Sequence, residues 1–141
     1  MVNNAGIYDA NKLMGAYHVS SDMRVLETNL VGTILGTTLA LEKMSLESGG
    51  AGGLVVQISS VAALITTKAS SLYKASKYGV LGYVRSHGPD AERLTGVRMV
   101  AVCPGMTDTH LVRRVFNNWE GELKFNENTR ALTPQEVSMS N

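Results

Sequence analysis

The sequence predicts an α/β fold built around a parallel β-sheet. Helical and extended segments alternate along the chain in the order helix, strand, helix, strand. The two clearest strands, residues 54–58 and 97–102, are largely apolar on both faces, which is typical of central strands covered by helices. Alternating units of this kind form parallel sheets with right-handed crossovers. The 141 residues suffice for one domain with a hydrophobic core.

Composition and charge are those of a globular protein. Hydrophobic residues make up 44% of the chain and charged residues 18%, which argues against disorder. The net charge of +1 gives no electrostatic reason to expect nucleic acid or a membrane as partner. The single Cys103 cannot form an intrachain disulfide, so we expect a reducing compartment, the cytoplasm. The three histidines lack ligand spacing, so we expect no metal.

The first half of the chain predicts a strand end and a long helix. Only two residues precede the small, polar turn Asn3–Gly6, which resembles the turn after a buried strand. A helix is expected from Ser20 or Ser21, either of which can cap it, to Met44, before the glycines of residues 49–53 end it. Its apolar face is predicted to consist of Leu26, Leu30, Ile34, Leu41 and Met44.

A second helix is expected to carry Tyr73 and Lys77 and to run to about Arg93. Gly88 and Pro89 lie inside this segment. Because a proline in a helix interior costs about 3 kcal/mol, we expect it to kink the helix or end it early.

The remaining segments are predicted to be loops with short helices. Residues 61–70 form a loop of small residues, and Cys103–Gly105 ends the last strand. Residues 106–130 are weakly patterned, with one possible short helix at 111–116. Residues 133–136 have the sequence of a capping box with proline at the first helical position, which predicts a further helix.

Tyr73 and Lys77 form a candidate proton-transfer site. Four residues apart on a helix, they share one face. Ligands of parallel sheets bind outside the carboxyl ends of the strands, where Ser60 follows the strand 54–58. A nearby ammonium favours a phenolate, so we expect Lys77 to lower the pKa of Tyr73 from about 10 and to make it a usable acid or base. The alternative is an ordinary amphipathic pair, because Tyr-x-x-x-Lys is common by chance.

Five motifs, in order and at suitable separations, make the chain resemble the short-chain dehydrogenase/reductase family. They are Asn3-Asn4-Ala5-Gly6, Asn29 within Asn-Leu-Val-Gly, Ile58-Ser59-Ser60, Tyr73-Lys74-Ala75-Ser76-Lys77, and Pro104-Gly105-Met106-Thr107-Asp108-Thr109. Residues 41–53 are also similar to the 15-hydroxyprostaglandin dehydrogenase-like branch.

The resemblance implies a Rossmann-type, doubly wound parallel sheet and an oxidoreductase that interconverts a secondary alcohol and a carbonyl. The implied cofactor is NAD or NADP, of which NAD is favoured. Tyr73 would transfer the proton, Ser60 would orient the substrate oxygen, and Lys77 would lower the tyrosine pKa and bond the nicotinamide ribose. Asn29 would kink its helix around a water that links the lysine to solvent.

The resemblance also implies residues that border the ligands. Ser70, three residues before the tyrosine, occupies a substrate-facing position, beside Ser60 and Tyr73. The helices around Asn29 and Tyr73 are those through which family members dimerise, so a homodimer or homotetramer is implied for the full-length protein. The residues expected to border the cofactor, besides Tyr73 and Lys77, are Asn4, Ala5, Gly6, Pro104, Gly105, Thr107 and Thr109.

The sequence departs from the family pattern at both ends. The glycine-rich turn that binds the cofactor pyrophosphate, and the final helix and strand, are absent from these residues. We therefore expect residues 1–141 to form a single incomplete domain, the catalytic C-terminal half, with an exposed sheet edge. We also expect these residues to bind NAD weakly or not at all. The alternative function is a non-catalytic, truncated product that pairs through its helices with a full-length relative.

Overall fold

The computed structural model describes residues 1–8, 19–65, 70–117, 133 and 135, with the side chains of residues 19–22 and 114–117 outside that description. Strands β1 (Val2–Asn3), β2 (Gly53–Ile58) and β3 (Val97–Val102) form a parallel sheet in the order β1-β2-β3. Val2 pairs with Val56, and Ile58 pairs with Val102. The predicted parallel sheet and both predicted strands are confirmed.

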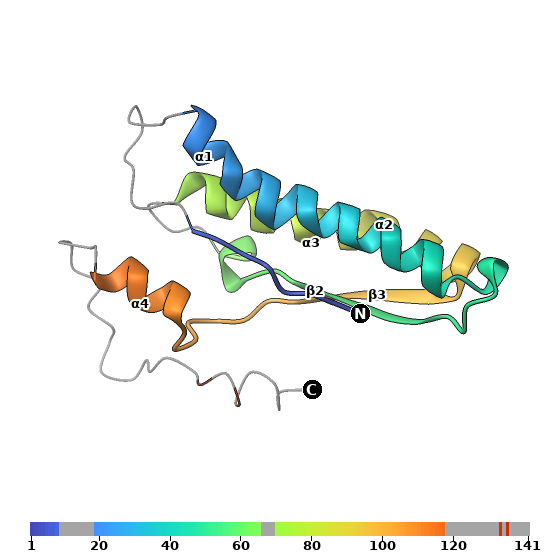
Figure 1. Ribbon diagram of the computed structural model, residues 1–141. Helices are drawn as coiled ribbons and strands as arrows, with labels where there is room; N and C mark the ends of the chain where they lie inside the picture. Colours follow the sequence, from blue (N-terminus) through green and yellow to red (C-terminus); the bar gives the residue numbers. More distant parts are fainter. Residues whose placement is uncertain (9–18, 66–69, 118–132, 134, 136–141) are drawn as a thin grey trace.

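Three helices lie along one face of this sheet (Figure 1). They are α1 (Val19–Leu26), α2 (Gly32–Met44) and α3 (Ser71–Thr95), while α4 (His110–Asn117) lies beyond the carboxyl end of β3. The core between the helices and the sheet contains Ala40, Val55, Val84, Ala91, Val97 and Met99. Within the described part of the chain, no helix is long and apolar enough to cross a membrane.

The long first helix is present, but its buried face differs from the predicted one. A π-helical turn (η1, Glu27–Val31) joins α1 to α2. The five residues predicted to form the apolar face are each half-buried. The fully buried positions of these helices are Val25, Asn29, Thr33, Thr37 and Ala40. Leu41 and Met44 of the predicted face pack against the core, but hydrogen bonds, rather than apolar contacts, select most of the face that meets the sheet.

A polar layer of Asn3, Thr37 and Gln57 holds α2 against β1 and β2. The Gln57 amide, fully buried, donates to Thr37 Oγ1 at 2.6 Å. Asn3 Nδ2 donates to Gln57 Oε1 at 2.8 Å and to Thr37 Oγ1 at 3.2 Å. A Cβ on Gly36 would lie 2.5 Å from Asn3 Oδ1, so only a glycine allows this close approach of helix and strand.

Helix α3 continues past Pro89 to Thr95, close to the expected end at about Arg93, so the proline does not end the helix early. A proline in a helix clashes with the Cβ of the preceding residue, and Gly88 has no Cβ. Gly88 and Ala91 are buried against the sheet side of the helix, which holds the chain helical on both sides of the proline.

The connecting segments agree with the predictions where they are described. Helix α4 matches the short helix expected at 111–116. A 3₁₀ turn (η3, Val61–Ala63) follows β2. The helix expected at 133–136 lies outside the described residues, apart from Thr133 and Gln135.

Candidate active site

The carboxyl ends of the three strands converge on the start of α3. Backbone hydrogen bonds join the segments that leave β2 and β3: Ser59 N donates to Val102 O at 2.8 Å, and Val61 N donates to Pro104 O at 2.9 Å. The buried Ser59 hydroxyl donates to the carbonyl of Lys77 at 2.9 Å, which fixes α3 to the end of β2. The strand ends and the helix therefore form one connected edge.

Ser60 and Tyr73 meet at this edge through a side-chain hydrogen bond. Ser60 precedes η3, and its Oγ also accepts the Ala62 N–H at 3.1 Å. That second bond restrains the Ser60 side chain. The predicted partnership of Ser60 with Tyr73 is thus present in the geometry.

Lys77 is buried beside the tyrosine, with 5% of its surface exposed. Its Nζ donates to Ile58 O at 2.8 Å and lies 5.7 Å from the centroid of the Tyr73 ring. Burial lowers the pKa of Lys77 to about 8, although Cys103 nearby acts in the opposite direction. Gly6 approaches the ammonium closely, since a Cβ there would lie 3.7 Å from Nζ.

The pKa of Tyr73 is raised, whereas we expected Lys77 to lower it. Burial of the phenol is the main cause, and the nearby Tyr8 adds to it, while the hydrogen bond with Ser60 acts in the opposite direction. The Lys77 ammonium bonds the Ile58 carbonyl instead of the phenol, so it does not offset the loss of hydration.

Asn29 is fully buried and joins the residues after β1 to α3. Its amide donates to Ile7 O at 2.9 Å and to Ser76 Oγ at 3.0 Å, and its Oδ1 accepts the Ile7 N–H at 2.8 Å. Ser76 in turn donates to the carbonyl of Tyr73 at 2.6 Å. Asn29, where a kink was expected, lies within the π-helical turn η1.

The residues expected to border the cofactor surround the same edge. Asn4 and Ala5 are exposed directly after β1, and Gly6 is half-buried beside Asn29 and Lys77. These positions leave the backbone between Asn4 and Gly6 accessible at the carboxyl end of the sheet.

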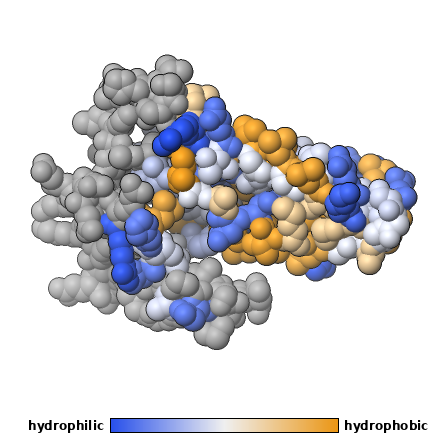
Figure 2. Space-filling view, in the orientation of Figure 1, coloured by the Kyte–Doolittle hydropathy of each residue, from blue (hydrophilic) through white to orange (hydrophobic). Residues whose placement is uncertain are grey.

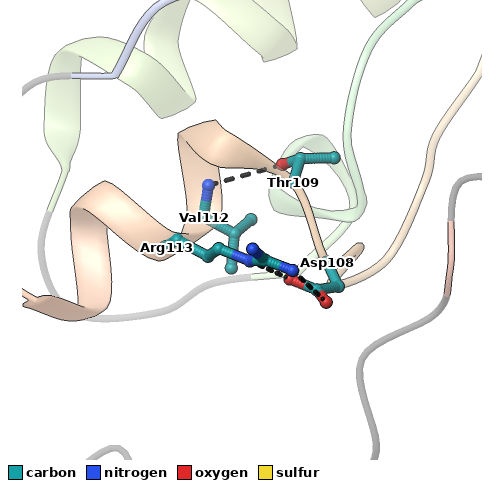
Figure 3. A network of polar contacts seen from close by, with 4 residues as sticks. All are labelled: Asp108, Thr109, Val112 and Arg113. Carbon is teal, nitrogen blue, oxygen red and sulfur yellow. Dashed lines mark hydrogen bonds and ion pairs between the residues drawn. The ribbon is translucent and has the colours of Figure 1, made fainter.

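The turn after β3, residues 104–109, is shaped by its own hydrogen bonds. Thr107 Oγ1 donates to Gly105 O at 3.2 Å. Figure 3 shows Thr109 at the start of α4, where its Oγ1 accepts the Val112 N–H at 3.4 Å. It also shows Arg113 donating two hydrogen bonds, of 2.7 and 2.9 Å, to the Asp108 carboxylate. These bonds lower the pKa of Asp108. This turn thus enters α4 in a defined conformation.

Ser70, which was expected to face the substrate, is buried beside Tyr8. It is 3% exposed, and its hydroxyl donates to the Tyr8 hydroxyl. Tyr8 packs its ring on that of Tyr73, with centroids 4.8 Å apart and planes at 45°. Sequence reasoning missed Tyr8, and the available signal was an aromatic residue two positions after the Asn-Asn-Ala-Gly turn. It also missed the bridging role of Ser76.

Comparison with known proteins agrees with this arrangement. The family model described as short chain dehydrogenase matches residues 1–120. The chain is 36% identical over 116 residues to 15-hydroxyprostaglandin dehydrogenase [NAD(+)] of Bos taurus, covering 82% of this chain and 40% of that protein. It is 35% identical over 132 residues to alcohol dehydrogenase 2 of Ceratitis cosyra, covering 87% of this chain and 51% of that protein.

Solved structures give the same result. Levodione reductase superposes with a TM-score of 0.74 at 31% identity, covering 83% of this chain and 44% of that one. ElxO with NADP bound superposes with a TM-score of 0.69 at 28% identity, covering 82% of this chain and 45% of that one. The chain thus spans about half the length of these proteins or less, and its sheet is the corresponding part of a Rossmann-type fold. By sequence and by fold, it belongs to the short-chain dehydrogenase family.

Proposed function

We propose that the full-length protein is an NAD(P)-dependent oxidoreductase that interconverts a secondary alcohol and a carbonyl. The observation that carries this proposal is the Ser60–Tyr73 hydrogen bond beside the buried Lys77. Ser60 holds the substrate oxygen, and Tyr73 gives it a proton or takes one from it. When bound, the nicotinamide would supply or accept the hydride.

The environment of Lys77 fits the ribose of such a cofactor. An ammonium has three donors, and among the described residues Ile58 O accepts one of them. A Cβ on Gly6 would lie 3.7 Å from Nζ, so the absence of a side chain there keeps this side of the ammonium open to a ligand hydroxyl. Asn29 holds this turn against α3 and acts as a positioning residue. We assign Asn4, Ala5, Pro104, Gly105, Thr107 and Thr109 to the border of the cofactor site.

The raised pKa of Tyr73 sets a pH dependence for the two directions. A phenol that stays protonated at neutral pH is ready to donate in carbonyl reduction, whereas alcohol oxidation needs the phenolate. Reduction should therefore be constant up to about pH 7 and fall as Lys77 loses its proton near pH 8, while kcat/KM for oxidation should rise between about pH 6 and pH 7, where Lys77 stays protonated.

The test is turnover of butan-2-ol and 1-phenylethanol by the full-length protein with NAD or NADP, followed by absorbance of the reduced nicotinamide. Tyr73→Phe keeps the ring and removes the acid, so kcat should fall by roughly 100-fold to 10,000-fold. Tyr83→Phe is the matched control, because Tyr83 lies on the same helix but stacks on His87. It should retain wild-type turnover.

Two outcomes would count against the proposal. Turnover that survives Tyr73→Phe would refute the assigned proton transfer. A folded wild-type protein that oxidises no alcohol and reduces no ketone with either dinucleotide would favour the alternative, a non-catalytic partner of a longer relative.

We also propose that the protein forms a homodimer through α2. Val31 at the end of η1 and Leu35 and Leu39 of α2 recur every four residues and are 46%, 59% and 60% exposed. Figure 2 shows hydrophobic side chains at the surface along the helical layer. Exposure of these apolar side chains to water is unfavourable in a monomer, whereas two copies of the chain can bury them against each other.

Light scattering after gel filtration tests this proposal. The wild-type protein should have the mass of a dimer, and the double substitution Leu35→Glu, Leu39→Glu should give a monomer. Leu94→Glu is the control, since Leu94 is 54% exposed near the end of α3. A wild-type protein that is monomeric at all concentrations would contradict the proposal.

A further inference from the structure

The site contains a side chain to which no role has been given, Tyr8. It follows β1 by five residues and is half-buried. Its ring centroid lies 4.8 Å from that of Tyr73, within the range of a favourable aromatic pair. Among the described aromatic residues, it is therefore the one that packs directly on the proton-transfer phenol.

Tyr8 also accepts a hydrogen bond from the hydroxyl of Ser70, the residue that was expected to face the substrate. Ser70 is 3% exposed and donates to the Tyr8 hydroxyl. Buried and bonded in this way, Ser70 cannot meet a substrate unless Tyr8 moves. Tyr8 is the more exposed member of the pair, so it covers Ser70.

The backbone of Ser70 supports a specific arrangement here. Ser70 has φ 59° and ψ 49°, and it is the one described residue other than glycine with a positive φ. A left-handed conformation is unfavourable for a residue with a Cβ and persists where the surroundings hold it. The hydrogen bond to Tyr8 is one of the contacts that hold it, at the residue directly before α3.

The geometry points to Tyr8 as a specificity-determining residue that limits the size of the substrate group next to the reacting carbon. Ser60 binds Tyr73 and Lys77 lies 5.7 Å from its ring, so the Tyr8 ring is a further wall of the space around the phenol. The preferred substrates are thus secondary alcohols or ketones whose substituent on this side is small or flat. This inference rests on the proposed function.

The pKa of Tyr73 gives a supporting observation. Tyr8 is among the causes that raise it, which is consistent with two phenols close enough to interact. Replacing Tyr8 with phenylalanine should leave the wall in place and remove this electrostatic effect.

The experiment compares a small ketone with a bulky one in the full-length protein. Butan-2-one and cyclohexyl methyl ketone are titrated into the wild type and into Tyr8→Phe, Tyr8→Ala and Ser70→Ala, and Kd is measured by ligand NMR. Binding does not depend on turnover, so a failure of the proposed chemistry would leave this measurement intact. Reduction of the same ketones then gives kcat/KM for each variant.

The preference is the ratio of Kd, or of kcat/KM, between the bulky and the small ketone. We expect Tyr8→Ala to shift both ratios in favour of the bulky ketone by roughly tenfold or more, the size of effect that a contact with the pocket lining gives. Tyr8→Phe and Ser70→Ala each remove the hydrogen bond between the two hydroxyls but keep the aromatic ring, so both should lie between the wild type and Tyr8→Ala. A purely structural Tyr8 predicts that Tyr8→Ala weakens both ketones equally. An unchanged preference in Tyr8→Ala would therefore overturn the inference.

Discussion

At the scale of single residues, the most unusual group is the buried ammonium of Lys77. Burial lowers its pKa from 10.5 to about 8 because a charged group loses hydration in the interior. One hydrogen bond to Ile58 O does not replace that hydration fully. The buried charge therefore destabilises the folded state, as expected of a lysine that serves function rather than stability.

The cost of Lys77 should appear in the pH dependence of stability. Between about pH 8 and pH 10.5 the unfolded lysine binds more protons than the folded one, so the free energy of unfolding should rise with pH, by up to about 3 kcal/mol. Below that window both forms are protonated and the full cost is present. Tyr73, whose pKa is raised, gives the opposite slope only above about pH 10.

Urea unfolding between about pH 7 and pH 10 measures this slope. Lys77→Met should remove the rise and should be more stable than the wild type at the acidic end. Lys43→Met, at an exposed lysine of α2, should leave the slope as it is. Equal slopes in the wild type and Lys77→Met would show that the lysine is solvated in the folded protein.

The site residues differ in how far the sequence could predict them. Ser60, Tyr73, Lys77 and Asn29 stand out because their types and spacing carry chemistry, and the structure brings them to one edge of the sheet. Tyr8 could not be found in this way, since its contact with Tyr73 spans 65 positions of the chain and depends on tertiary packing. The direction of the Tyr73 pKa shift could not be predicted from the sequence either, because it depends on how deeply the phenol is buried.

At the scale of elements, α3 shows how a glycine can accommodate a proline. The sequence predicts the strands well, because their apolar runs report burial on both faces directly. The end of α3 lies close to the predicted one, but the effect of Pro89 was harder to predict, since the rule that proline breaks helices takes no account of the residue before it. With Gly88 preceding Pro89, the clash with the preceding Cβ is absent, and the helix continues to Thr95.

This explanation predicts that the effect of Gly88→Ala changes sign with its neighbour. Next to Pro89, the new Cβ clashes with the proline ring, and stability should fall by about 1–2 kcal/mol. With Pro89→Ala in place, the same substitution should stabilise the helix by about 0.5–1 kcal/mol, because alanine is the better helix former. Space is available, as the Cβ would lie 3.6 Å from Met99 Cβ, an ordinary contact.

The four proteins of this double-mutant cycle are compared by thermal and urea unfolding. If Gly88→Ala destabilises equally in both backgrounds, the packing against Met99 decides the effect, and the account of the proline is wrong.

At the scale of the whole molecule, a layer of polar side chains joins the helices to the sheet. Asn3 comes from β1, Thr37 from α2 and Gln57 from β2, and the three share hydrogen bonds in the interior. Strand β1 has only two residues, so this layer supplies much of what holds it in register. Hydropathy patterns could not predict it, because they place apolar residues inside and polar ones outside.

Removal of the Thr37 hydroxyl should therefore loosen β1 as well as destabilise the fold. Thr37→Val keeps the shape but leaves the amides of Asn3 and Gln57 with one buried acceptor fewer. The free energy of unfolding should fall by roughly 1–3 kcal/mol. Exchange of the Val56 amide proton, which donates to Met1 O, should accelerate because β1 separates from β2 more often.

Thr38→Val is the matched control for this change. Thr38 is the next residue of α2 and donates to Ile34 O at 3.1 Å, as Thr37 does to Thr33 O, but it is exposed. Its substitution should alter the free energy of unfolding by less than about 0.5 kcal/mol and leave the Val56 exchange rate unchanged. Equal effects of the two substitutions would mean that the hydroxyl acts within its own helix and that the buried amides find other acceptors. A larger effect of Thr37→Val on both readouts would establish the polar layer as the connection between β1 and the helices.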